Sequence, residues 1–197
     1  MIRILLSAIL LLGFTHALFV EEEFNSKEVK VFLSPDSYLK INGKTNVSTF
    51  QCQFDIATFS KGVSLMYKDY DSIIKFDAAK LTLPNLKFDC GGKAINKDFN
   101  KLLNTDEHPE IILNLREISK QLNDKNTVNA IIEITICDII KTYTIPVSVA
   151  NEGGICVSGL LPININDFNL TAPTKMLGIV KVYPEIEIDF LLQISKP

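Results

Sequence analysis

Few residues of this chain are of the types that carry out acid–base or metal chemistry. His108 stands within Asp106-Glu107-His108-Pro109-Glu110, where an imidazole and three carboxylates are close in sequence. Such a group could act as a general base or bind a metal. The sequence places no nucleophile beside it, and the only other histidine is His16 near the N-terminus. We therefore expect a solvated turn here, no catalytic residue and no metal site.

The four cysteines are the other reactive side chains: Cys52, Cys90, Cys137 and Cys156. Their spacing lacks the close pairs of a zinc site. Cys52 alternates in phase with Phe54, and Cys90 with Phe88, so both thiols are expected on inward faces at strand ends. This favours a Cys52–Cys90 disulfide. A Cys137–Cys156 bond is disfavoured because their strands would not be neighbours in a meander, and the alternative is that all four thiols are free.

The N-terminus has the pattern of a cleavable export signal. Arg3 precedes an apolar run from Ile4 to Phe14, and the small-x-small triplet Thr15-His16-Ala17 follows. The run is too short to span a bilayer well, although an uncleaved anchor is the alternative. The first cysteine is Cys52, so a lipoprotein attachment site is missing. We expect residues 1–17 to be a signal peptide and the mature protein to be periplasmic or extracellular, where disulfides form.

From residue 29 onward, apolar and polar residues alternate as in strands with one buried face. The alternation is clearest over 130–136, 143–149, 155–165 and 186–194, with tight turns expected at 138–141 and 151–154. The stretch 60–71 is less regular and predicts an edge strand or a long loop. Pro84 interrupts a strand predicted over 81–88 and implies a bulge or an unpaired position. Closing about eight such strands into a barrel removes their exposed edges.

One segment departs from this alternation. A strand-like run ends in Cys90-Gly91-Gly92, and the next residues have helical spacing, with Ile95, Phe99, Leu102 and Leu103 on one face. The turn around His108 then leads into another strand. A double glycine is too short to hold a phosphate, so it predicts a strand-to-helix turn.

This segment resembles the part of YceI-like proteins in which a strand leaves the barrel, forms a helix and re-enters through a His/Tyr-Pro turn. The matching residues are Lys97-Asp98-Phe99, Leu102-Leu103 and His108-Pro109-Glu110-Ile111. Further motifs similar to that family lie at 41–47, 134–147, 166–170 and 172–182, in the order in which the family has them. The likeness therefore covers residues 36–195. Two departures are Cys137-Asp138, where the family has an Ala-Gly turn, and Asn169, where it has Gly.

The resemblance implies an all-β fold, a lipocalin-like antiparallel eight-stranded β-barrel with one short amphipathic helix. Residues 18–35 would form an N-terminal segment with the first strand, and 36–197 the YceI-like β-barrel domain. In that family the apolar interior holds a polyisoprenoid or similar lipid. It thus implies a carrier whose partner is a hydrophobic small molecule such as an isoprenoid lipid or quinone, with transient membrane contact and no other cofactor. The oligomeric state stays open.

The candidate lumen residues are those on the inward phase of the strands: Phe50, Phe54, Phe88, Ile132, Ile134, Tyr143, Ile145, Val157, Phe190 and Leu192. Periodicity alone cannot separate a lipid tunnel from an ordinary core, because both use the same face of the sheet. One alternative is therefore a filled barrel that acts as an envelope structural or interaction module. An enzyme acting on a lipid is less favoured, since Tyr143 is the main polar group on this face.

Charge and length set further limits. The 197 residues carry 20 Lys and Arg against 23 Asp and Glu, a net charge of −3. The lysines are dispersed among acidic residues, which argues against nucleic-acid binding and against a polybasic membrane anchor. No repeat or linker divides the chain, so we expect a single domain after the leader.

Overall fold

The computed structural model describes residues 26–121, 126–151, 154–175 and 179–195. The predicted signal peptide therefore lies outside the described residues. Helical elements are η1 (Ile56–Phe59), η2 (Asn85–Lys87), α1 (Lys93–Leu102) and η3 (Ile165–Phe168). The strands are β1 (Lys27–Leu33), β2 (Tyr38–Thr45), β3 (Thr49–Phe54), β4 (Val63–Asp69), β5 (Ile73–Ala78), β6 (Lys80–Pro84), β7 (Phe88–Asp89), β8 (Glu110–Ser119), β9 (Thr127–Ile136), β10 (Ile139–Ala150), β11 (Ile155–Asn164), β12 (Thr174–Lys175) and β13 (Val180–Ser195).

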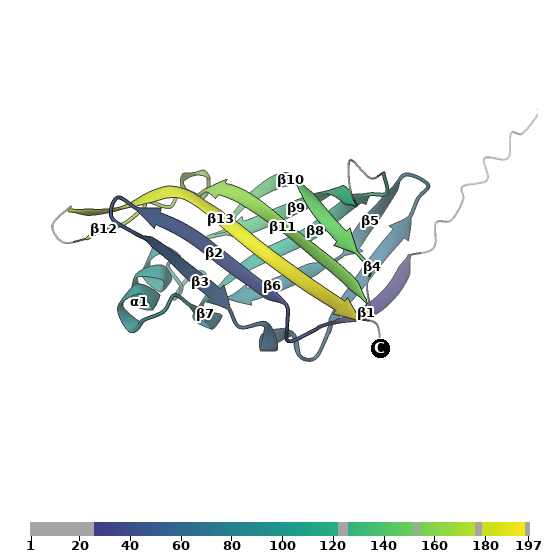
Figure 1. Ribbon diagram of the computed structural model, residues 1–197, viewed down its shortest axis with the longest axis horizontal. Helices are drawn as coiled ribbons and strands as arrows, with labels where there is room; N and C mark the ends of the chain where they lie inside the picture. Colours follow the sequence, from purple (N-terminus) through teal and green to yellow (C-terminus); the bar gives the residue numbers. More distant parts are fainter. Residues whose placement is uncertain (1–25, 122–125, 152–153, 176–178, 196–197) are drawn as a thin grey trace, which may run out of the picture.

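Eight strands form a closed ring in the order β1-β4-β5-β8-β9-β10-β11-β13 (Figure 1). The ring closes where Phe32 and Leu33 of β1 pair with Ser195 and Ile194 of β13. All of its pairings are antiparallel, as short hairpin connections require. The predicted eight-stranded barrel is therefore confirmed, and β1, from the predicted N-terminal segment, is one of its strands.

The remaining strands widen the barrel at one end. β2 pairs with β13, β3 with β2 and β7 with β3, while β6 pairs with β8. Among the described residues, no strand pairing joins β3 or β7 to β6. Helix α1 lies at this end of the molecule, beside β3 and β7 (Figure 1). A short seam in the sheet is thus covered by side chains and a helix instead of by backbone hydrogen bonds.

Two predicted segments differ from the structure. The stretch 60–71 contains β4, which pairs with β1 on one side and β5 on the other, so it is neither an edge strand nor a loop. The predicted strand over 81–88 breaks after Pro84 into η2 and β7. Leu86, which a continuous strand would turn inward with Phe88, is exposed. Proline ends the strand because it has no amide hydrogen to donate to a neighbour.

The β9–β10 turn also lies earlier than predicted. Ile136 pairs directly with Ile139, so Cys137 and Asp138 form a two-residue hairpin loop. Both have positive φ, 47° and 63°, as a type I′ turn requires. Asn169, at φ 56°, likewise adopts the left-handed conformation expected of the glycine that it replaces.

Candidate functional site

An apolar cavity of about 70 Å³ lies inside the barrel at the α1 end. Every residue that lines it is Leu, Ile, Phe or Val. Its walls come from the inward faces of β2, β8, β9, β11 and β13, with Leu39, Leu113, Ile134 and Ile163 among the buried contributors. Side chains of this kind offer no hydrogen bond, so the cavity suits only apolar groups.

Helix α1 closes the cavity at the seam. Phe99, Leu102 and Leu103, from the end of α1 and the residue after it, line the space, as the predicted helical spacing requires. No residue of α1 itself is buried, so the helix covers the cavity without being part of the main core. Its packing rests on half-buried side chains, Ile95 and Phe99 among them.

Aromatic rings join the helix to the barrel. Phe88 contacts Phe99 of α1 at a ring-centre distance of 5.2 Å and Phe54 of β3 at 5.0 Å. Phe54 also contacts Phe59, at 5.5 Å. These separations are typical of favourable edge and tilted pairs. Phe54 therefore packs behind Phe88, and does not line the cavity.

The segment that leads into α1 is firmly attached to the barrel. A disulfide joins Cys52 of β3 to Cys90, the pairing that the sequence favoured. The Cys90 amide donates to Asn96 Oδ1 at 2.7 Å, and Gly91, at φ 85°, makes the turn into the helix. Cys137 and Cys156 are free thiols.

Asp89 completes this attachment. Its Oδ1 accepts hydrogen bonds from Asn96 Nδ2 and from the Gly91 amide, both at 3.0 Å. These two bonds, that of Asn96 first, hold the pKa of Asp89 below its usual range. The carboxylate thus fixes the strand-to-helix turn that carries the cavity's lid.

Three of the ten candidate lumen residues line the cavity: Phe50, Phe88 and Ile134. The strand registers place a further six on the same inward face without bringing them to the cavity: Ile132, Tyr143, Ile145, Val157, Phe190 and Leu192. Ile145 is buried in the core, whereas Val157 and Leu192 are half-buried. The candidate lumen residues are therefore spread along the barrel, and only three of them line the cavity.

Phe50 and Phe190, two of the candidate lumen residues, each lie over a glycine of the neighbouring strand. A Cβ at Gly43 would collide with the ring of Phe50, which lies opposite it in the register. In the same way the ring of Phe190 lies over Gly159, where a Cβ would be only 2.8 Å from it. The missing side chain of each glycine leaves room for the ring that lies over it, and a larger residue there would force the ring to move.

Tyr143 is the polar exception that the sequence indicated. Its hydroxyl is buried and has no hydrogen-bond partner among the described residues. Burial, and then the charge of Asp167, raise the pKa of this phenol above its ordinary value. Tyr143 lies opposite Ile132 in the register and so faces the interior.

Sequence reasoning missed several residues that line the cavity, including Leu83, Ile165 and Leu170. Leu83 lies just before the strand-breaking Pro84, Ile165 is the first residue of η3, and Leu170 follows η3. Alternation over 155–165 reached Ile165 without marking it as a lumen residue, and it could not find Leu170, which belongs to no strand. The Asp-Phe-Asn-Leu motif that follows β11 was the available signal for them.

His108 and the neighbouring acidic residues hold a turn together. His108 Nδ1 lies 3.3 Å from Asp138 Oδ2 in the β9–β10 turn, and the His108 carbonyl accepts from Asn85 Nδ2 at 2.7 Å. Glu107 accepts from Asn104 at 2.7 Å. In the described part of the chain, no group of three or more His, Cys, Asp or Glu is placed to hold a metal ion. Nor does any described helix have the length and apolar character needed to cross a bilayer.

Comparisons with known proteins place this architecture. No protein-family model and no curated protein matches the sequence. Among solved structures, BcnA of Burkholderia cenocepacia is 25% identical, with a TM-score of 0.57 over 81% of this chain and 96% of that one. A polyisoprenoid-binding domain from Saccharophagus degradans is 13% identical, with a TM-score of 0.62 over 86% of this chain and 99% of that domain.

A YceI protein of Campylobacter jejuni is 12% identical, with a TM-score of 0.49 over 98% of this chain and 99% of that one. At this distance it adds nothing to the argument, and the first two likenesses carry the fold. The fold of these two structures is the one that the motifs at 36–195 predicted for this chain. The resemblance read from the sequence is therefore confirmed at the level of the fold: the chain is a YceI-like, lipocalin-like β-barrel.

Proposed function

We propose that this chain is an exported binding protein that holds a long apolar ligand, such as a polyisoprenoid, a quinone tail or a similar lipid, inside the barrel. The observation that carries the proposal is the wholly apolar cavity beneath α1. A prenyl chain has no hydrogen-bonding groups, so a dry apolar wall is all that its recognition needs. Each Å² of apolar surface buried contributes roughly 25 cal/mol before the costs of binding.

The description of the S. degradans domain as polyisoprenoid-binding supports this class of ligand. Its likeness to this chain is one of fold, so the choice among lipids rests on experiment. The predicted leader at 1–17 and the Cys52–Cys90 disulfide support export to an oxidising compartment. We further propose that the protein is not an enzyme and that it meets a membrane only transiently, to load or release its ligand.

The volume of the cavity requires a movable wall. Sites for drug-sized ligands enclose roughly 300–1,000 Å³, and the cavity measures about 70 Å³. Helix α1 is the wall that can yield, because none of its residues is buried and no side chain caps its N-terminus. The disulfide and the two hydrogen bonds of Asn96 hold the start of α1 while the remainder of the helix moves.

The same small volume favours a second candidate function. If α1 does not move, the protein is a filled barrel that serves as an envelope structural or interaction module. Ligand binding by the delipidated protein separates the two, because a filled barrel leaves an isoprenoid unbound.

A pair of leucine substitutions tests the location of the ligand. Leu170→Trp adds bulk to a half-buried residue of the cavity wall, and we expect it to lower the affinity for farnesol at least about tenfold, because the apolar tail loses its space. Leu160→Trp is the matched control, since Leu160 is 53% exposed on β11. The measurement is a fluorescence-displacement titration of delipidated mature protein. Equal affinity of both variants and the parent would place the ligand elsewhere.

A further inference from the structure

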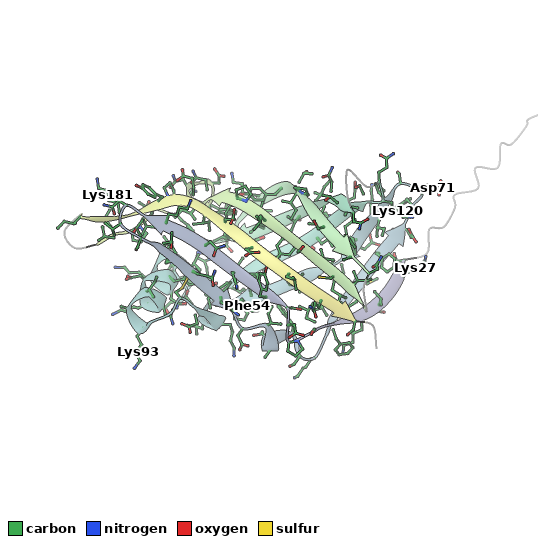
Figure 2. All side chains as sticks on the ribbon, viewed as in Figure 1. Lys27, Phe54, Asp71, Lys93, Lys120 and Lys181 are labelled. Carbon is green, nitrogen blue, oxygen red and sulfur yellow. A yellow bond between two sulfur atoms is a disulfide. The ribbon has the colours of Figure 1, made fainter. Side chains whose placement is uncertain are left out.

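A small charged cluster lies at the end of the barrel opposite α1. Lys120 Nζ lies 2.6 Å from Asp69 Oδ1, and Lys27 Nζ lies 3.4 Å from Asp69 Oδ2. The three residues come from β1, from the end of β4 and from the position after β8. Figure 2 shows Lys27 and Lys120 at the right-hand end of the barrel, with Lys93 of α1 at the far end.

The strand registers place this cluster on the interior face. Lys27 is in phase with Val29 and Val31 of β1, and Val31 is buried. From β4, Asp69 pairs across the sheet with Ile74 of β5, and Ile74 pairs with Ile118 of β8. Ile118 pairs with Ala130 of β9, which is buried inside the barrel. Paired residues share a face of the sheet, so the charged groups point inward.

The inward side chains at this end of the barrel are only partly covered. No residue of β4 or β5 is buried, although the inward phase of these strands carries Leu65, Ile74 and Phe76. The Lys27 side chain is 59% exposed and that of Lys120 is 36% exposed. Apolar side chains that face the lumen and yet remain half-exposed form a wall against which an apolar chain can lie.

The cluster is positively charged overall. Two ammonium groups share one carboxylate, which leaves a net charge of +1, and the bond to Lys120 and then that to Lys27 hold the pKa of Asp69 below its usual range. Lys68, on the outer phase of β4, pairs instead with Asp77. A cation at an apolar opening attracts anions more strongly than one on open surface, because the low-dielectric wall focuses its field.

We propose that Lys27 and Lys120 bind the anionic headgroup, phosphate or carboxylate, of an amphiphile whose apolar tail extends into the barrel toward α1. This inference rests on the proposed function and adds to it the headgroup chemistry and the direction in which the ligand lies. Lys27 is the freer of the two groups, with the longer distance to Asp69 and the greater exposure. Asp69 positions both ammonium groups and competes with the ligand for them.

The experiment compares three ligands on delipidated mature protein: farnesyl phosphate, palmitate and the uncharged farnesol. We expect the K27M/K120M variant to lose about tenfold in affinity for the anionic ligand and to bind farnesol within about twofold of the parent. Lys30→Met is the matched control, an exposed lysine on the outer phase of β1. Asp69→Asn should act in the opposite direction, raising the affinity for the anion about threefold, because it removes the competing carboxylate.

The outcomes separate the two proposals. If the affinity for farnesyl phosphate or for palmitate falls when the two lysines are replaced, the headgroup site is supported. The ligand that shows the loss identifies whether the anion is a phosphate or a carboxylate. The headgroup site is overturned if neither the double variant nor Asp69→Asn changes the affinity for the anions. It is also overturned if the double variant loses as much affinity for farnesol as for the anionic ligand. If none of the three ligands binds the parent protein, the proposed function itself fails.

Discussion

At the scale of single residues, Tyr143 is a polar side chain on the inward face of the barrel whose hydroxyl the described part of the chain leaves unsatisfied. This hydroxyl lies opposite the apolar Ile132 in the strand register. An unbonded buried donor costs free energy, so its presence has to be balanced by packing or by a bound molecule.

Replacing this residue tests whether the hydroxyl is free. Tyr143→Phe should leave the free energy of unfolding unchanged or raise it by up to about 1 kcal/mol, because it removes an unsatisfied donor and keeps the ring. Urea denaturation of the delipidated protein measures this, with Tyr183→Phe at an exposed position as the control. A loss of more than about 1 kcal/mol would mean that the hydroxyl has a partner.

Asp89 gives a pH dependence whose sign is fixed. Its pKa in the folded protein lies below the ordinary value of 3.8, through Asn96 and then Gly91. The stability that it contributes is therefore complete above pH 3.8 and lost as the pH falls through the lower folded value. Thermal unfolding of the parent and of Asp89→Asn should show a difference in Tm that shrinks below that pH. A difference that grows on acidification would contradict this role.

At the scale of elements, the sequence predicted α1 and the strands on both sides of it, because helical and strand periods differ plainly there. Alternation failed at 60–71, where β4 carries polar as well as apolar inward residues, Asp69 among them. It also failed at 86, because a proline can end a strand as readily as it bends one. The spacing of Cys52 and Cys90 on inward phases was sufficient to favour their bond.

The disulfide should matter most for the seam. It closes a loop of sequence separation 38, for which the chain-entropy model gives about 4 kcal/mol of stability. We expect the C52A/C90A variant to lose about 2–4 kcal/mol in urea denaturation, and Cys156→Ala to lose less than about 1 kcal/mol, because Cys156 is a half-buried free thiol. An equal loss in both would show that cavity formation, and not the cross-link, sets the cost.

At the scale of the whole molecule, the sequence predicted the barrel and its inward face but not the position of the cavity along it. Alternation tells on which side of a strand Ile134 and Leu192 lie, and both are inward. It does not tell where along the barrel they lie relative to the cavity. The cavity's position depends on β2, β3, α1 and η3, which all lie at one end of the barrel. Nor does it place Lys27 beside Lys120, since residues so far apart in sequence meet only after the ring closes.

The most direct test of ligand binding is native mass spectrometry of the mature protein purified from its own exported fraction, followed by organic extraction. We expect a protein of the mature mass from Leu18 with one bound apolar molecule of isoprenoid or quinone size, released on extraction. An unbound mass that persists after incubation with a panel of isoprenoids would contradict the proposal and leave the filled barrel as the description of this protein.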